Sequence, residues 1–243
     1  MSAKNISSHS LHKEVAKSTA GKPSIFVITL DGPAGAGKST VAKSLAKRLG
    51  ITYLDTGSMY RAITLKALRL KMDLSDEEAF TNLARNTKIS FKEMPDGALN
   101  VTLDGEDVSV AIRTVEVTNN TFYAARTPGV RTLMVAWQRA IGQARSVVTD
   151  GRDQGTVVFT DAKYKFYVDA DVEERVGRRY RELVAVGKSV DLDKLRADMK
   201  DRDHKDFTRA VGPLKKAPDA ITIDSTGLTV EGTVDRIMKL IQL

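Results

Sequence analysis

Residues 32–39 read Gly-Pro-Ala-Gly-Ala-Gly-Lys-Ser and match the phosphate-binding loop G-x-x-x-x-G-K-[ST] at every fixed position. The apolar, β-branched run at 25–30 that precedes them is typical of a buried strand. After them, Val41, Leu45 and Leu49 recur every four residues, which predicts a helix with one apolar face. Strand, glycine loop and helix follow one another in the order that such a loop requires, so the sequence predicts a nucleoside triphosphate site.

Each part of the loop has a physical task at a triphosphate. Its glycines let the backbone turn N–H groups inward toward phosphate oxygens, and the positive end of the following helix dipole adds to the attraction. Lys38 is long enough to reach the outer phosphates, and the hydroxyl of Ser39 is a ligand for Mg²⁺. The residues predicted to bind the triphosphate are Gly32, Pro33, Ala34, Gly35, Ala36, Gly37, Lys38, Ser39 and Thr40.

The composition is that of a globular protein. The 243 residues are 42% hydrophobic and 28% charged, which suits one α/β domain with a small insertion. Without cysteine the chain has no disulfide, thiolate metal site or cysteine nucleophile, which favours a cytoplasmic location. No apolar run approaches the ~20 residues that cross a bilayer, so we expect no membrane partner. Residues 1–24, rich in Ser, Lys and Ala, are predicted to be a flexible tail.

The net charge of +7 is compatible with two kinds of partner. A basic cleft suits a small anionic substrate as well as a nucleic acid, so charge alone does not separate them. The chain has no basic stretch interleaved with aromatic residues and no recognised nucleic-acid module, so we expect small anions and no nucleic acid. The sequence indicates no large exposed apolar face, and a monomer is expected.

Strand-like runs and helical spacings alternate along the rest of the chain. Further strands are predicted at 51–54, 146–150, 165–168 and 221–223. Helices are predicted at 58–70, from a cap at Ser75 onward, at 115–144 with a break at 127–129, at 172–186 after a cap at Asp171, at 192–207 and at 229–242. Residues 88–108 alternate with period two around a turn at 95–97, which predicts two or three antiparallel strands. The whole predicts an α/β fold whose five-stranded parallel sheet has helices on both faces and ligands at the carboxyl ends of its strands.

A phosphate loop indicates only that a triphosphate binds, so the acceptor has to be inferred from other residues. The base-reading N-K-x-D of GTP-binding domains is missing from the sequence, as is the second half of a helicase. Bringing two nucleotides together requires a second anion site, for which planar guanidinium groups are suited. Arg152 stands out, because Asp150-Gly151-Arg152-Asp153 ends a buried strand at the binding edge of the sheet.

Four longer stretches carry a family resemblance. They read Leu-Asp-Gly-Pro-Ala-Gly-Ala-Gly-Lys-Ser-Thr at 30–40, Leu-Asp-Thr-Gly-Ser-Met-Tyr-Arg at 54–61, Asp-Gly-Arg-Asp-Gln-Gly-Thr-Val-Val-Phe at 150–159 and Arg-Asp-His-Lys-Asp-Phe-Thr-Arg-Ala-Val-Gly-Pro-Leu at 202–214. With Asp-Ser-Thr at 224–226, the chain resembles the bacterial cytidylate kinases, a branch of the P-loop nucleoside monophosphate kinases. The resemblance implies a three-layer P-loop fold in one kinase domain at 25–243. It also implies a monophosphate-binding region at 57–125, its β insertion near 88–108, and a helical lid at 172–210.

The resemblance also implies roles for single residues. Those that resemble the catalytic, phosphoryl-clamping residues are Lys38, Arg131, Arg152, Arg202 and Arg209. Those that resemble acceptor-binding residues are Thr56, Tyr60, Arg61, Arg131, Arg152, Asp153, Arg202, Asp206 and Arg209. Asp150 ends its strand like the carboxylate that helps to hold Mg²⁺, so Ser39 and Asp150 are the predicted metal ligands.

The resemblance also implies how the base of the acceptor is recognised. Asp153 and Asp206 are similar to the family's carboxylates near the acceptor's ribose and cytosine amino group, and a carboxylate accepting from N4 selects cytosine over uracil. The chain departs from the family at Phe122, where a base-contacting serine is usual. A phenyl ring donates no hydrogen bond, and the neighbouring Thr121 is the candidate substitute. How strictly the base is chosen is left open.

The resemblance implies that a cluster of arginines on the lid folds over the triphosphate. Its members are Arg175, Arg178, Arg179 and Arg181, of which Arg178 is counted with the ATP-binding residues. We expect Asp171 to pair with Arg175, four residues later on the same helix.

Together these features predict the phosphorylation of CMP and dCMP by ATP, with Mg²⁺ as cofactor. There are three alternatives: a kinase of another small acceptor, an ATPase stimulated by nucleic acid, and a nucleotide sensor without turnover. The acceptor could be UMP or a shikimate-like metabolite, or the chain could be an ATPase stimulated by nucleic acid. A nucleotide sensor without turnover is disfavoured, since loop, strand-end and arginine elements are all present.

Overall fold

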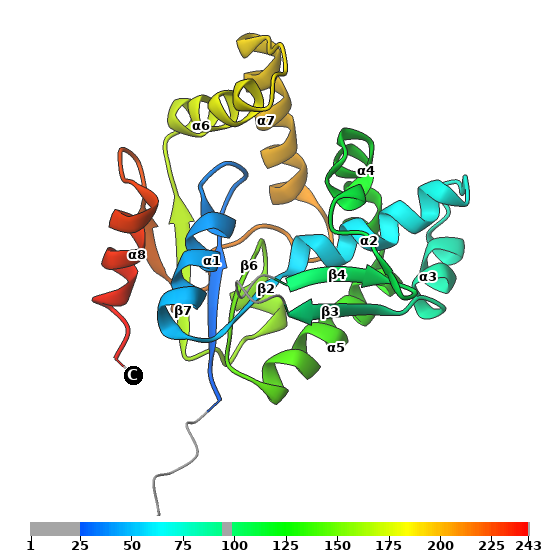
Figure 1. Cartoon of the computed structure of the whole chain (residues 1–243), viewed down its shortest axis with the longest axis horizontal. Coiled ribbons are helices and arrows are strands. Elements are labelled where there is room, and N and C mark those ends of the chain that lie inside the picture. The colour runs from blue at the N-terminus through cyan, green and yellow to red at the C-terminus, as the bar shows by residue number, and fades with distance from the viewer. Residues whose placement is uncertain (1–24, 94–98, 243) are drawn as a thin grey trace, which may run out of the picture.

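Five parallel strands form the central sheet, in the order β2-β6-β1-β7-β8 (Figure 1). The computed structural model describes residues 25–93 and 99–242, so the predicted tail and the predicted turn at 95–97 lie outside the described residues. The strands are β1 Val27–Asp31, β2 Thr52–Asp55, β6 Val147–Gly151, β7 Tyr164–Asp169 and β8 Ile221–Asp224. The predicted α/β fold with a five-stranded parallel sheet is confirmed, and the strand ends lie within two residues of the predicted ones.

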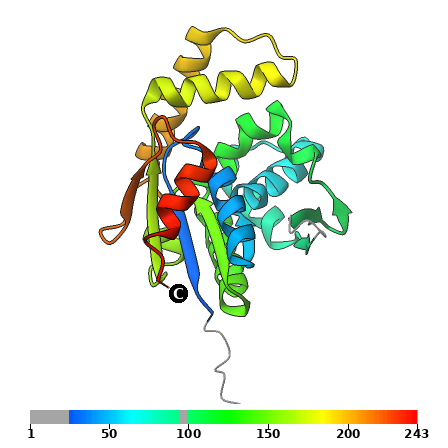
Figure 2. The same ribbon diagram turned by 60° about the vertical axis from the view of Figure 1, so that its left-hand side comes forward.

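Helices cover both faces of this sheet. They are α1 Lys38–Leu49, α2 Thr56–Arg69, α3 Glu77–Arg85, α4 Val115–Arg126, α5 Pro128–Ala144, α6 Val172–Ala185, α7 Leu192–Thr208 and α8 Val230–Met238, with short turns of 3₁₀-helix at Ala111–Arg113 and of π-helix at Gln154–Val158. Helices α1 and α8 lie on one face and α5 on the other (Figure 2). Helix α5 packs closely against β1 and against Phe159. A Cβ on Gly142 of α5 would lie 2.6 Å from the Phe159 ring and 3.3 Å from the Val27 side chain of β1. The described helices include none that is long and apolar enough to cross a membrane.

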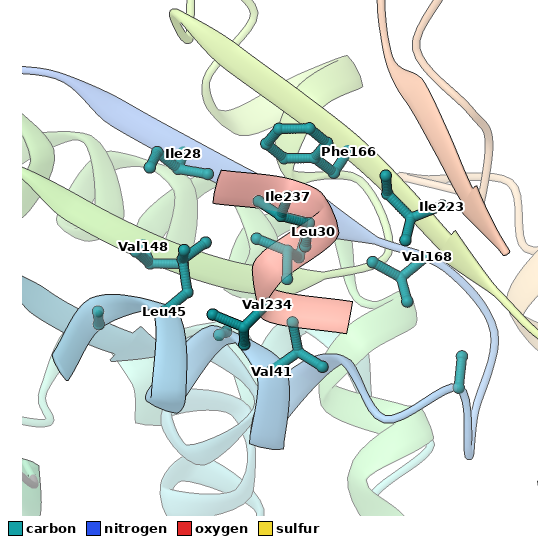
Figure 3. Packing of buried hydrophobic residues seen from close by; sticks show 13 residues of the cluster. Ile28, Leu30, Val41, Leu45, Val148, Phe166, Val168, Ile223, Val234 and Ile237 are labelled. Carbon is teal, nitrogen blue, oxygen red and sulfur yellow. The ribbon is translucent and has the colours of Figure 1, made fainter. Parts of the chain in front are cut away.

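The main core lies between the sheet and the helices α1 and α8 (Figure 3). Alternate residues of a strand point to the same face, so Ile28 and Leu30 of β1 both enter this core, and both are fully buried. The side chains packed with them are Val41 and Leu45 of α1, Val148, Phe166, Val168 and Ile223 of the neighbouring strands, and Val234 and Ile237 of α8. Each large side chain buried here contributes roughly 1.5–3 kcal/mol to the stability of the fold. The loop between β1 and α1 is therefore held at both ends by well-packed elements.

A second, antiparallel sheet is inserted between α3 and α4. Its strands are β3 Ile89–Glu93, β4 Leu99–Leu103 and β5 Glu106–Asp107, paired in that order. Val101 and Leu103 pack with Leu65 of α2 in an apolar cluster separate from the main core. The insertion lies beside α2 and α3, away from the helices α6 and α7 (Figure 1).

Two predicted helix ends are wrong, and a third is in the predicted place but lacks the expected capping bond. Asp76, not Ser75, caps α3: its Oδ1 accepts from the Ala79 N–H at 2.9 Å, while Ser75 is bound through its N–H and hydroxyl to Asp73. Helix α8 ends at Met238 rather than at 242, because the amides of Leu240 and Ile241 bond three residues back in a tighter turn. Asp171 stands at the start of α6, but its side chain makes no capping hydrogen bond.

Candidate active site

The phosphate loop turns from β1 into α1 at the carboxyl ends of the strands, beneath helices α6 and α7 (Figures 1 and 2). Parallel pairing places Asp150 of β6 opposite Leu30 of β1 and opposite Asp55 of β2. The ends of β2 and β6 therefore bring two carboxylates next to the loop that follows β1. This is the edge at which open α/β sheets bind ligands.

Lys38 is buried inside the loop, with 5% of its surface exposed, and its Nζ donates to the Pro33 carbonyl at 2.5 Å. Burial lowers the pKa of Lys38 well below its ordinary value, and the nearby Arg152 lowers it further, while Asp150 opposes both. The ammonium is thus poorly solvated and held by few groups. A poorly solvated cation at this place gains strongly from an added phosphate oxygen.

Ser39 and Asp150, the predicted metal ligands, are in contact. The Ser39 hydroxyl donates to Asp150 Oδ2 at 2.6 Å, and the Tyr53 hydroxyl donates to the other carboxylate oxygen at 2.8 Å. Burial raises the pKa of Asp150, and so does its neighbour Asp55. Hydroxyl and carboxylate oxygens are the hard donors that Mg²⁺ prefers, so these residues fit the ion. Among the described residues no group of three or more potential His, Cys, Asp or Glu ligands is found.

Beside the loop lies a set of arginines paired with carboxylates. Arg131 forms a buried ion pair with Asp153, and the guanidinium of Arg209 lies 4.0 Å from the same carboxylate. Arg152 Nε donates to Asp206 at 2.6 Å. We call these five residues the arginine–carboxylate cluster.

The two carboxylates of the arginine–carboxylate cluster differ in their electrostatics. Burial raises the pKa of Asp153 and outweighs the arginines around it. Burial also acts on Asp206, but Arg152 and the other arginines prevail and hold its pKa below the ordinary value. Arg202 is different: it is exposed and makes no hydrogen bond or ion pair with another described residue. An unpaired cation next to a buried cluster is free to bind an anion.

The remaining predicted acceptor residues, Thr56, Tyr60 and Arg61, lie on α2. The Thr56 hydroxyl donates to the Asp150 carbonyl at 2.7 Å, and Arg61 Nη2 lies 3.2 Å from both oxygens of Asp55. Tyr60 is 9% exposed, its ring centroid lies 5.9 Å from the guanidinium carbon of Arg131, and burial raises its pKa to about 12. Tyr60 thereby meets Arg131 of the arginine–carboxylate cluster, and Thr56 meets Asp150 beside the phosphate loop.

Sequence patterns do not indicate two further residues that contact the carboxylates Asp150 and Asp55. Tyr53 was assigned only to a strand, and its hydrogen bond to Asp150 follows from strand pairing across nearly a hundred residues. Arg113, just after the β insertion, lies 3.4 Å from Asp55, which it shares with Arg61. Neither residue belongs to a motif that could have indicated it.

A cavity of about 580 Å³ opens on the other side of the loop. It is bounded by the loop and the start of α1, by α6, and by residues 225–230 between β8 and α8. Arg178 closes one wall: its guanidinium donates to Ser225 O at 2.6 Å and to Glu174 at 2.9 Å. Leu228 and Val230 add apolar surface. The sequence signals for this wall are the Asp-Ser-Thr stretch at 224–226 and Arg178, which the resemblance counts with the ATP-binding residues.

The four lid arginines do not act as one group. Arg175 is 5% exposed and pairs with Asp203 of α7 rather than with Asp171, so the predicted pair within α6 is wrong. Its guanidinium points back toward the phosphate loop, where it donates to the Ala34 carbonyl. Arg179 and Arg181 are exposed and pair with glutamates of the same helix.

Phe122 lies on α4, facing α7. The guanidinium carbon of Arg126 lies 5.5 Å from its ring centroid, and Nζ of Lys205 lies 5.9 Å from it. The neighbouring Thr121 hydroxyl donates to the Val117 carbonyl within the helix, so its proton is already in use. Thr121 could still accept a hydrogen bond from a ligand, but not donate one without breaking this contact.

Comparison with known proteins identifies the family. Residues 28–243 match the model of the cytidylate kinase family. The chain is 50% identical over 214 residues to a cytidylate kinase of Geobacillus sp. (strain WCH70), covering 88% of this chain and 95% of that relative. It is 47% identical over 218 residues to a cytidylate kinase of Clostridioides difficile (strain 630), covering 90% of this chain and 99% of that relative.

Among solved structures, an uncharacterized protein of Eubacterium ventriosum ATCC 27560 shares the fold, with a TM-score of 0.50 at 15% identity over 90% of this chain and 98% of that one. The phosphate loop, the paired Ser39 and Asp150 and the arginine–carboxylate cluster occupy one edge of this fold. The chain belongs to the cytidylate kinase family.

Proposed function

We propose that the protein transfers the γ-phosphoryl group of ATP to CMP and dCMP, giving ADP and the nucleoside diphosphate. One observation carries this proposal: the loop with buried Lys38 separates a cavity large enough for a nucleoside from a cluster of arginines. Two phosphate-bearing ligands can therefore meet at Lys38 from opposite sides. The relatives named above carry the same activity in their names.

The donor lies along the loop in this proposal. Backbone N–H groups of residues 35–39 and the Lys38 ammonium hold its phosphates, and its base enters the cavity beside Ser225 and Val230. Ser39 and Asp150 would hold Mg²⁺, which supplies charge neutralisation at the phosphate oxygens when it is bound. Tyr53 and Thr56 keep Asp150 oriented toward Ser39.

The acceptor lies on the side of the arginine–carboxylate cluster. Its phosphate is already ionised at neutral pH, so no general base is needed. Arg131, Arg152 and Arg209 orient it, and the unpaired Arg202 stabilises the charge on the migrating group. With both ligands held in line, catalysis consists of positioning and electrostatic stabilisation, while α6 and α7 keep water away.

Base choice in this proposal depends on carboxylates at the acceptor side. Asp153 or Asp206 accepts from the exocyclic amine of cytosine, and uracil would face the same carboxylate with an oxygen. A buried acceptor left unpaired discriminates strongly. Thr56, Tyr60 and Arg61 complete this pocket. The monomeric state, the cytoplasmic location, the absence of a nucleic-acid partner and the domain boundaries stay predictions.

The proposal is tested by measuring ADP release with ATP, Mg²⁺ and a panel of acceptors. The rate of ADP release with CMP or dCMP is expected to lie far above the rates with UMP, AMP, GMP and shikimate. That result would also show that Phe122 is tolerated near the base. Faster turnover of UMP would overturn the base assignment. Turnover that requires added RNA or DNA would overturn the acceptor assignment as a whole.

Gly212→Ala is expected to raise KM for CMP by about tenfold while leaving KM for ATP unchanged. Gly212 has a φ of 57°, and a Cβ there would overlap the Arg131 guanidinium and the Asp153 carboxylate, forcing their ion pair apart. Gly187→Ala is the matched control, because Gly187 has a φ of 76° with nothing within 4 Å of its Cβ position. Initial-rate kinetics on both variants check this, and an equal effect of the control would refute it.

A further inference from the structure

Ala34 of the phosphate loop is held at both of its backbone polar atoms by side chains from the lid helices. Its N–H donates to Asp203 Oδ1 of α7 at 3.3 Å, and its carbonyl accepts from Arg175 Nη1 of α6 at 2.9 Å. The same Arg175 nitrogen lies 2.6 Å from the other oxygen of Asp203. Three contacts thus close a ring through residues from three elements. We call Arg175 and Asp203 the Ala34 clamp.

The Ala34 clamp is shielded from solvent. The side chains of Arg175 and Asp203 are 6% and 14% exposed, and Arg175 Nε also donates to the Ala170 carbonyl at the end of β7. Gly35 next to it has no side chain, and a Cβ there would lie 2.9 Å from Met199 of α7 and 3.2 Å from Arg175. Charge-assisted hydrogen bonds in a shielded place are stronger than exposed ones. The lid helices are therefore seated directly on the loop.

We propose that Arg175 and Asp203 are positioning residues for the phosphate loop, which couple the placement of the lid helices to triphosphate affinity. The two side chains fix where Ala34 lies, and Ala34 sets the path of the residues that follow it in the loop. Because α6 supplies one partner and α7 the other, any shift of these helices relative to β1 displaces the loop. This inference depends on the proposed function only in that the loop binds ATP.

A second ion pair between the same two helices provides a control. Arg196 of α7 binds Glu173 of α6 through two nitrogens, at 2.9 and 3.0 Å, but this pair is exposed and forms no hydrogen bond or ion pair with the phosphate loop. Exposed pairs of this kind contribute little to stability. If lid integrity alone mattered, loss of either pair would have a similar effect on ATP binding. If the clamp positions the loop, only its loss weakens ATP binding.

Isothermal titration calorimetry with MgATP and, separately, with CMP tests the inference on the full-length protein. Asp203→Asn keeps the shape but turns an amide N–H₂ toward either Arg175 or the Ala34 N–H. The expected result is a rise of about tenfold in Kd for MgATP and less than a twofold change in Kd for CMP. Arg196→Ala is expected to change neither by more than twofold.

Arg175→Lys is the second variant, and it covers the case in which Asp203→Asn fails to fold. A lysine keeps the charge but cannot bind Ala34, Ala170 and Asp203 at once, so a smaller rise in Kd for MgATP is expected, again without a change for CMP. The inference is overturned if both clamp variants have the Kd for MgATP of the parent protein or of Arg196→Ala. It is also overturned if their Kd for CMP rises by the same factor as their Kd for MgATP. A parent protein that binds no MgATP would instead overturn the proposed function.

Discussion

Lys38→Met reduces kcat by about 10³-fold and leaves the fold intact; this is the largest effect that we expect of a single substitution. The ammonium is buried in the loop and its pKa is depressed by burial, so a phosphate in transfer gains more from this charge than from one in water. Methionine has nearly the same length and no charge to desolvate, so the thermal midpoint is expected to stay the same or rise.

The measurement pairs ADP-release kinetics with thermal unfolding followed by circular dichroism. Lys43→Met on the exposed side of α1 is the matched control and is expected to keep full activity. Near-parental turnover of Lys38→Met would refute the role of Lys38. A large loss of thermal stability would show that Lys38 supports the fold instead of the reaction.

Arg152→Ala lowers kcat/KM for CMP by about 100-fold, while the affinity for ATP changes by less than threefold. Arg152 binds Asp206 at the centre of the arginine–carboxylate cluster, so the substitution removes a guanidinium fork and also leaves a buried carboxylate without its main partner. The freed Asp206 repels the acceptor phosphate, which adds to the loss.

Arg152→Lys separates charge from geometry, because an ammonium keeps the charge but not the fork, and an intermediate loss is expected. Arg69→Ala removes an arginine from an exposed pair with Glu106 and serves as the control without kinetic effect. Both ligands are compared by initial-rate kinetics and by calorimetry with ATP alone. Equal damage to ATP and CMP use would contradict the assignment of Arg152 to the acceptor side.

The parts of the site that the sequence predicts well are those set by a few neighbouring residues. The loop around Lys38 and Ser39 needs glycines, a strand and a helix in immediate succession, so a local pattern specifies it. Asp150 and Arg152 follow an apolar strand, and a strand end in a parallel sheet is a binding edge whatever the rest of the chain does.

The parts that sequence patterns did not predict depend on which strands become neighbours. Tyr53 reaches Asp150 only because β2 pairs with β6, and Arg131 meets Asp153 only because α5 packs against the π-helical turn that follows β6. Arg175 looked like one more lid arginine, since its spacing on α6 does not reveal that it faces Ala34. Helix caps were also missed where two candidates compete, as at Ser75 and Asp76.

If the acceptor phosphate binds at the arginine–carboxylate cluster as proposed, the carboxylates of the cluster limit how tightly the diphosphate product is held. A phosphate that binds Arg152 or Arg131 replaces an internal carboxylate, so binding is an exchange of one anion for another and yields less free energy than binding to unpaired arginines would. After transfer, Asp153 and Asp206 compete again for the same guanidinium groups. On the proposed assignment, this competition favours departure of the diphosphate, the kind of step that limits turnover in many enzymes with closing lids.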